Sequence, residues 1–147
     1  MANLSDVLGD AAKKTQIVDE CVALLDAEVG DRGGISGFAI KAGYGAVKGI
    51  RPGFVRQVVS DLLPEFASGL NPMIDEAQTE GTPVGKYLEQ NTGRVADALL
   101  AITDAKAQRA KNGAVKGAYD KLRGMAKKNV EAAVPRLGKL VEKHVKS

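Results

Sequence analysis

Residues 54–70 read FVRQVVSDLLPEFASGL, and their apolar positions recur at the three- and four-residue spacing of a helix. The apolar side chains form one broad face: Phe54, Val55, Val58, Val59, Leu62, Leu63, Phe66 and Leu70. A stripe of this width is typical of a helix packed against other helices. We expect this helix to begin at Arg51-Pro52, because proline is well tolerated at the first helical position.

Prolines and glycines are expected to interrupt the helical pattern downstream. Pro64 has no amide hydrogen, so it predicts a kink or a break within the helix. Asn71-Pro72 has the form of a cap followed by a first helical residue, which predicts a new helix there. Gly81 is a typical helix stop, and Thr82-Pro83 repeats the capping signal.

Two further helical patterns cover the chain downstream of Pro83. One runs from Val84 to Ala105, where Asn91-Thr92-Gly93 is a candidate interruption. Asn112-Gly113 is the expected stop after it. The other runs from Ala114 to about Val145 and carries a second kink signal at Pro135.

Upstream, residues 4–29 predict a first helix, with a break at Gly9 and a new cap at Asp10. The next segment, GISGFAIKAGYGAVKGI at 34–50, has glycine at five of its positions. Each glycine costs about 1 kcal/mol in a helix interior. Such a helix is reasonable if its small residues allow another helix to approach closely. The candidate packing or interface residues are Gly37, Gly43, Gly45 and Gly49.

The fold prediction is therefore an all-α, single-domain bundle over residues 1–147. We expect five to seven helices, proline kinks near residues 64 and 135, and a glycine-rich, closely packed second helix. No alternating strand pattern stands out, and the composition is poor in aromatic residues.

Charge divides this domain into two parts. Residues 1–104 hold nine Lys/Arg and fifteen Asp/Glu, whereas residues 105–147 hold twelve Lys/Arg and three Asp/Glu. We describe them as an acidic body and a basic C-terminal helical arm. Candidate residues for an anionic partner lie in the arm: Lys116, Lys121, Arg123, Lys127, Lys128, Arg136, Lys139 and Lys143. The partner could be nucleic acid, an anionic lipid surface, or the acidic body itself.

Catalytic and metal-binding patterns are missing from the sequence. The chain has one histidine, His144, and one cysteine, Cys21, which lies on the apolar stripe of the first helix. This pair offers neither the spacing of a zinc site nor an activated nucleophile. The glycines at 43–49 lack the strand that precedes a dinucleotide-binding loop. We therefore predict no catalytic residues, no metal, no cofactor and no small-molecule substrate.

The function predicted from these observations is a non-enzymatic helical interaction module that self-associates or binds a protein. The alternative is a non-specific binder of nucleic acid or an anionic membrane surface, acting through the basic C-terminal helices. A single cysteine and the absence of a signal-peptide pattern favour the cytoplasm. The glycine-rich segment and the Ala/Lys-rich tail are typical of bacterial proteins.

Overall fold

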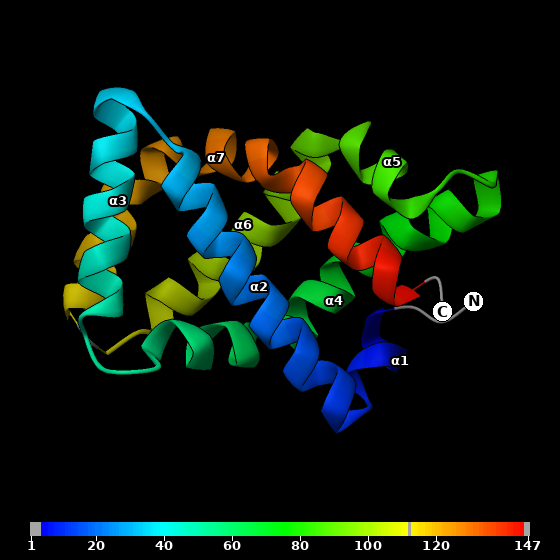
Figure 1. Cartoon of the computed structure of the whole chain (residues 1–147), viewed down its shortest axis with the longest axis horizontal. Coiled ribbons are helices and arrows are strands. Elements are labelled where there is room, and N and C mark those ends of the chain that lie inside the picture. The colour runs from blue at the N-terminus through cyan, green and yellow to red at the C-terminus, as the bar shows by residue number, and fades with distance from the viewer. Residues whose placement is uncertain (1–3, 112, 146–147) are drawn as a thin grey trace.

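The chain folds into a bundle of helices in a computed structural model, which describes residues 4–111 and 113–145 (Figure 1). In chain order the helices are α1 (Leu4–Leu8), α2 (Ala11–Asp31), α3 (Gly34–Lys48), α4 (Phe54–Glu80), α5 (Val84–Glu89), α6 (Thr92–Arg109) and α7 (Gly113–Val145). No strand occurs among these described residues, so the all-α prediction is confirmed. None of the helices in these ranges is long and apolar enough to cross a bilayer.

Several predicted helix boundaries are confirmed. The Asp10 side chain caps α2 by accepting hydrogen bonds from the backbone amides of Ala12 and Lys13. Gly81 ends α4 with a φ of 74°, a left-handed conformation that glycine adopts without strain. The interruption at Asn91 is also present, because α5 ends at Glu89 and α6 begins at Thr92. The turn signal at Asn112 lies outside the described residues.

The prediction of a new helix at Asn71-Pro72 is wrong, because α4 continues through both Pro64 and Pro72. Each interior proline costs about 3 kcal/mol. One continuous face of α4 outweighs this cost, since burying a large apolar side chain contributes about 1.5–3 kcal/mol. The buried residues of that face extend across both prolines: Val59, Leu62, Leu63, Ala67, Leu70, Met73, Ile74 and Ala77.

Asn71 stabilises a different helix from the one predicted. Its Oδ1 accepts a hydrogen bond from the Leu4 backbone amide at 3.3 Å, and its Nδ2 donates to Ser5 Oγ at 2.9 Å. Both partners are in the first turn of α1. The asparagine therefore fixes the short α1 against the middle of α4.

The long helix α7 connects the two ends of the molecule. It contains 33 residues, about 50 Å of helix, and Pro135 does not divide it. Figure 1 shows α3 at one end of the molecule and α5 toward the other, with α7 passing beside both. The C-terminal end of α7 lies close to α1.

The glycine-rich α3 is less closely packed than predicted. Of its described side chains, most are exposed, and Gly37 is the buried position. Its outward side includes Ile35, which is 92% exposed, and Phe38, which is 76% exposed. We expected this helix to be buried or at an interface, and within one chain it forms an outer wall.

Two clusters of buried side chains form the core. The larger joins α4, α5, α6 and α7 around Ile74, Leu88, Val95 and Val134. The smaller joins α1, α2 and α4 around Val7, Ile17, Val18, Val59 and Leu63. Residues of α4 contribute to both clusters. The space between them is the candidate site.

Candidate functional site

A cavity of about 340 Å³ lies between the two core clusters. Its wall is almost entirely apolar and comes from α1, α2, α3, α4, α6 and α7. The side chains at the α1 end of the wall, such as Leu4 and Ile17, are buried. Those toward α3, such as Val29, Ile40 and Phe66, are half-buried, and the cavity is partly open to solvent.

The composition explains why this space is not filled by the protein itself. The chain has no tryptophan, three tyrosines and three phenylalanines. Of these large side chains, Phe66 lines the cavity, whereas Phe38 points outward. The solvent-accessible surface is 7953 Å², although a folded monomer of 15.4 kDa exposes about 7200 Å². The surface includes both the wall of the open cavity and the exposed face of α3.

A cluster of charged and polar groups occupies one side of the cavity wall. Arg32 donates from Nε to Asn129 Oδ1 at 2.5 Å and from Nη2 to the Asn129 carbonyl oxygen at 3.1 Å. Its Nη1 also lies 3.0 Å from Glu28 Oε2. The other oxygen of Glu28 lies 3.0 Å from Arg136 Nη1, and Arg136 Nη2 donates to Asp31 at 2.6 Å. Glu28 therefore joins the end of α2 to α7 from a buried position.

Cys21 also lines the cavity, where its thiol is mostly protonated at neutral pH. Burial and, to a smaller extent, the nearby Glu20 carboxylate together raise the pKa of the thiol to about 11. The thiolate is the reactive form, so the side chain stays unreactive as a protonated thiol. Its surroundings agree with the sequence-based interpretation of a packing residue.

A second polar cluster joins α6 to α7 at the α3 end of the cavity. Thr103, which lines the cavity, shares a 2.8 Å hydrogen bond with the Tyr119 hydroxyl. Tyr119 also donates to Asp104. Arg123 binds both oxygens of Asp104, at 2.8 and 3.1 Å, and this ion pair holds the pKa of the carboxyl below its usual range. These groups bind one another and fix the two helices together.

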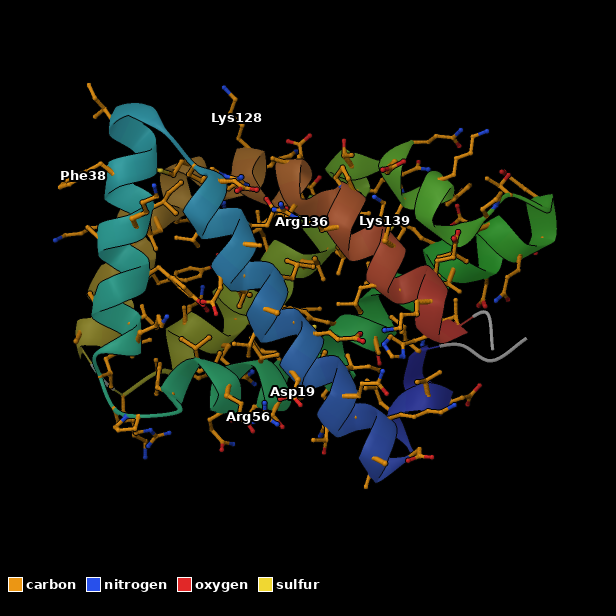
Figure 2. The ribbon with its side chains drawn as sticks, in the orientation of Figure 1. Asp19, Phe38, Arg56, Lys128, Arg136 and Lys139 are labelled. Carbon is orange, nitrogen blue, oxygen red and sulfur yellow. The ribbon has the colours of Figure 1, made fainter. Side chains whose placement is uncertain are left out.

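Half of the predicted basic residues form ion pairs with the acidic body. Arg123 binds Asp104, Lys127 Nζ lies 3.1 Å from Asp97, and Lys143 Nζ lies 2.5 Å from Glu20. Arg136, the fourth, belongs to the Glu28 cluster, and Figure 2 shows it directed toward α2. The charge asymmetry of the sequence thus holds α7 on α2 and α6 within one chain.

The other four predicted basic residues are exposed: Lys116, Lys121, Lys128 and Lys139. Within residues 4–111 and 113–145 they form no ion pair. They therefore present unneutralised charge to solvent.

The predicted glycines occupy different environments. A Cβ at Gly37 would lie 2.7 Å from the Arg32 carbonyl carbon, and one at Gly43 would lie 3.0 Å from the Leu122 side chain. At Gly45 a Cβ would meet nothing within 4 Å, and at Gly49 it would contact only its own helix. Among the described residues, close packing of this set is limited to Gly37 and Gly43.

His144 is buried near the end of α7 and is 7% exposed. Its Nε2 lies 2.6 Å from Glu20 Oε2, on the same carboxylate that binds Lys143. Burial acts to raise the pKa of Glu20, but the hydrogen bonds with Lys143 and His144 outweigh it, so the pKa lies below its ordinary value. Among the described residues, no three His, Cys, Asp or Glu side chains come together as metal ligands would.

Comparison with known proteins adds a family to this description. Residues 4–145 match the model of a family of unknown function, DUF6918. The chain belongs to this family. No curated protein and no solved structure matches this chain. The match covers every helix and every residue of the cavity wall, so the site lies entirely within the segment that defines the family.

Proposed function

We propose that this member of the DUF6918 family is a non-enzymatic helical module that binds an aliphatic chain in its apolar cavity. The observation that carries the proposal is the size and character of the cavity: about 340 Å³ with an almost wholly apolar wall. Pockets for small molecules typically have volumes of about 300–1,000 Å³ and mostly apolar walls. One water molecule occupies about 30 Å³ of the liquid. If each non-hydrogen atom of a ligand needs about the same volume, the cavity holds roughly eleven such atoms.

The polar groups of the wall support binding over catalysis. Arg32 and Glu28 are engaged in ion pairs and hydrogen bonds with each other, Asn129 and Arg136. Cys21 is protonated. A general acid, base or nucleophile needs a free and activated group directed at the substrate. These groups instead bind one another, which suits a wall that fixes helix positions.

Self-association, which the glycine spacing predicts, stays a prediction. Nucleic-acid binding through α7 is less well supported than the sequence suggested, because Arg123, Lys127, Arg136 and Lys143 already neutralise acidic side chains. Each ion pair removes a cation that a phosphate contact would need.

Calorimetric titration with straight-chain alcohols from hexanol to tetradecanol tests the proposed ligand class. A buried methylene contributes about 0.8 kcal/mol, so each added carbon should strengthen binding about fourfold. We expect this increase to level off near ten carbons, when the cavity is full. Absence of decanol binding up to its solubility limit contradicts the proposal.

A matched pair of variants on α7 locates the binding. Ala133 lines the cavity and Ala132 beside it is exposed. We expect Ala133→Leu to fill part of the space and weaken decanol binding at least tenfold, and Ala132→Leu to leave it unchanged. Equal affinities in the two variants would place the alcohol elsewhere and refute the cavity as its site.

A further inference from the structure

The outward face of α3 is an apolar surface that the rest of the described chain leaves exposed. Ile35 and Phe38 are its two large side chains, and both are mostly exposed. The remaining positions on this face are small and exposed: Ala42, Gly45, Ala46 and Gly49. Figure 2 shows Phe38 pointing away from the bundle at the end of the molecule formed by α3. Clustered apolar side chains in such a position are typical of an interaction site.

The charge around this face is positive. Between Asp31 and Asp61 the chain has no acidic residue and five basic ones: Arg32, Lys41, Lys48, Arg51 and Arg56. Three of these are neutralised by acids of α2, through the pairs Arg32–Glu28, Lys48–Asp26 and Arg56–Asp19. Lys41 forms no ion pair in the described part of the chain and is exposed on α3 itself.

The half of α7 that packs against α3 adds more unpaired cations. Gly43 of α3 lies against Leu122 of α7, so Lys121 belongs to the turn of α7 at this contact, and Lys128 lies farther along the same helix. Both are exposed and unpaired among the described residues. Figure 2 shows Lys128 extending into solvent at the same end of the molecule as Phe38.

We propose that α3 docks on an anionic lipid bilayer. Ile35 and Phe38 enter the boundary between headgroups and acyl chains, and Lys41, Lys121 and Lys128 face the negative surface. Helices that lie in a membrane interface have this combination of bulky apolar side chains and flanking lysines. Each lysine near an anionic leaflet adds to the attraction, which salt weakens.

Charge argues against the other occupants of this face. A second copy would bring the unpaired lysines of two such surfaces together, where like charges repel. Nucleic acid would neutralise the lysines, but its phosphate backbone offers no apolar surface to Ile35 and Phe38. A bilayer accommodates both features at once. The proposal does not depend on the cavity ligand, although Ile40 on the inner side of α3 lines the cavity.

Sedimentation with lipid vesicles tests the proposal. We expect the full chain to sediment with vesicles of phosphatidylglycerol and phosphatidylcholine at low salt, and to remain in solution with phosphatidylcholine alone or at high salt. The double substitution Ile35→Ser/Phe38→Ser should weaken binding at least tenfold. Both side chains are exposed, so helical circular dichroism should stay unchanged.

Matched charge reversals separate this face from general electrostatic attraction. Lys121→Glu/Lys128→Glu should weaken vesicle binding at least tenfold. Lys86→Glu/Lys139→Glu changes the net charge equally, at exposed positions on α5 and the distal half of α7, and should have little effect. The proposal is overturned if the chain does not sediment with anionic vesicles. It is also overturned if the two charge variants lose binding equally. A shift from dimer to monomer in the serine variant by light scattering, without any vesicle binding, would assign the face to a second copy.

Discussion

The backbones of Gly85 in α5 and Gly138 in α7 are in direct contact. A Cβ at Gly138 would lie 3.0 Å from the Gly85 carbonyl oxygen, and a Cβ at Gly85 would lie 3.1 Å from the Gly138 carbonyl oxygen. Glu142, one turn farther along α7, accepts a hydrogen bond from the Gly85 amide at 3.1 Å. The absence of side chains at both positions lets the short α5 pack closely against α7.

Substitution of Gly138 should therefore be far more damaging than substitution of Gly45 in α3, which has no close neighbour. We expect Gly138→Leu to lower the free energy of unfolding by about 3 kcal/mol, because overpacking a close contact forces the backbones apart. Gly45→Leu should leave stability unchanged or raise it by up to about 1 kcal/mol, since leucine is the better helix former and nothing lies within 4 Å of its Cβ. Urea denaturation followed by circular dichroism measures both. Similar losses in the two variants would contradict the assignment of close packing to Gly138.

The two glycines show what the sequence could and could not predict. Periodicity identified the helices, because apolar positions on one face recur whatever the tertiary structure. The five glycines between residues 34 and 50 also predicted close packing for the segment that forms α3. Which glycine meets another backbone depends on where two helices cross, and Gly85 and Gly138 are 53 positions apart. An isolated glycine in the interior of α7, with no turn signal beside it, was the available clue.

The candidate site was harder to predict than the fold. The cavity is bounded by side chains of six helices, and no residue pattern in the sequence records how those helices are placed relative to one another. Glu28 and Arg136 illustrate the same limit for charges. The acidic and basic halves were visible in the composition, but their pairing required the positions of α2 and α7. Asn71-Pro72 was misinterpreted because local capping signals were weighed without the buried face that carries α4 through the proline.

Glu76 should give the protein a measurable part of its acid sensitivity. Hydrogen bonds from Arg94, at 2.9 and 3.0 Å, and from Tyr87 lower the pKa of this carboxyl from its ordinary 4.5 to about 2. A depressed carboxyl pKa stabilises the fold fully above the unfolded value, and this contribution is lost as pH falls from about 4.5 toward 2.

We therefore expect Glu76→Gln to flatten the dependence of the unfolding free energy on pH between about 4.5 and 2. The measurement is urea denaturation at a series of pH values. Asp75→Asn is the control, because Asp75 is exposed on the same helix and forms no ion pair within the described residues. If both variants retain the slope of the unsubstituted chain, Glu76 does not contribute in this way.

Glu28 should be the ion-pair residue whose loss is most costly. It is 8% exposed and joins Arg32 to Arg136, so its removal leaves the partly buried Arg32 guanidinium without a counter-ion. Breaking a buried pair in this way costs about 3 kcal/mol or more. Asp19 provides the comparison, because its pair with Arg56, which Figure 2 labels, is exposed on both sides. An exposed pair contributes at most about 1 kcal/mol.

Urea denaturation of Glu28→Gln and Asp19→Asn measures this difference at neutral pH. We expect the first variant to lose about 3 kcal/mol and the second less than about 1 kcal/mol. Because Glu28 and Arg32 line the cavity, Glu28→Gln should also weaken decanol binding, whereas Asp19→Asn should not. Equal stability losses would mean that the Glu28 cluster contributes no more than a surface pair. In that case the position of α7 against α2, and with it the cavity wall, would depend on apolar packing alone.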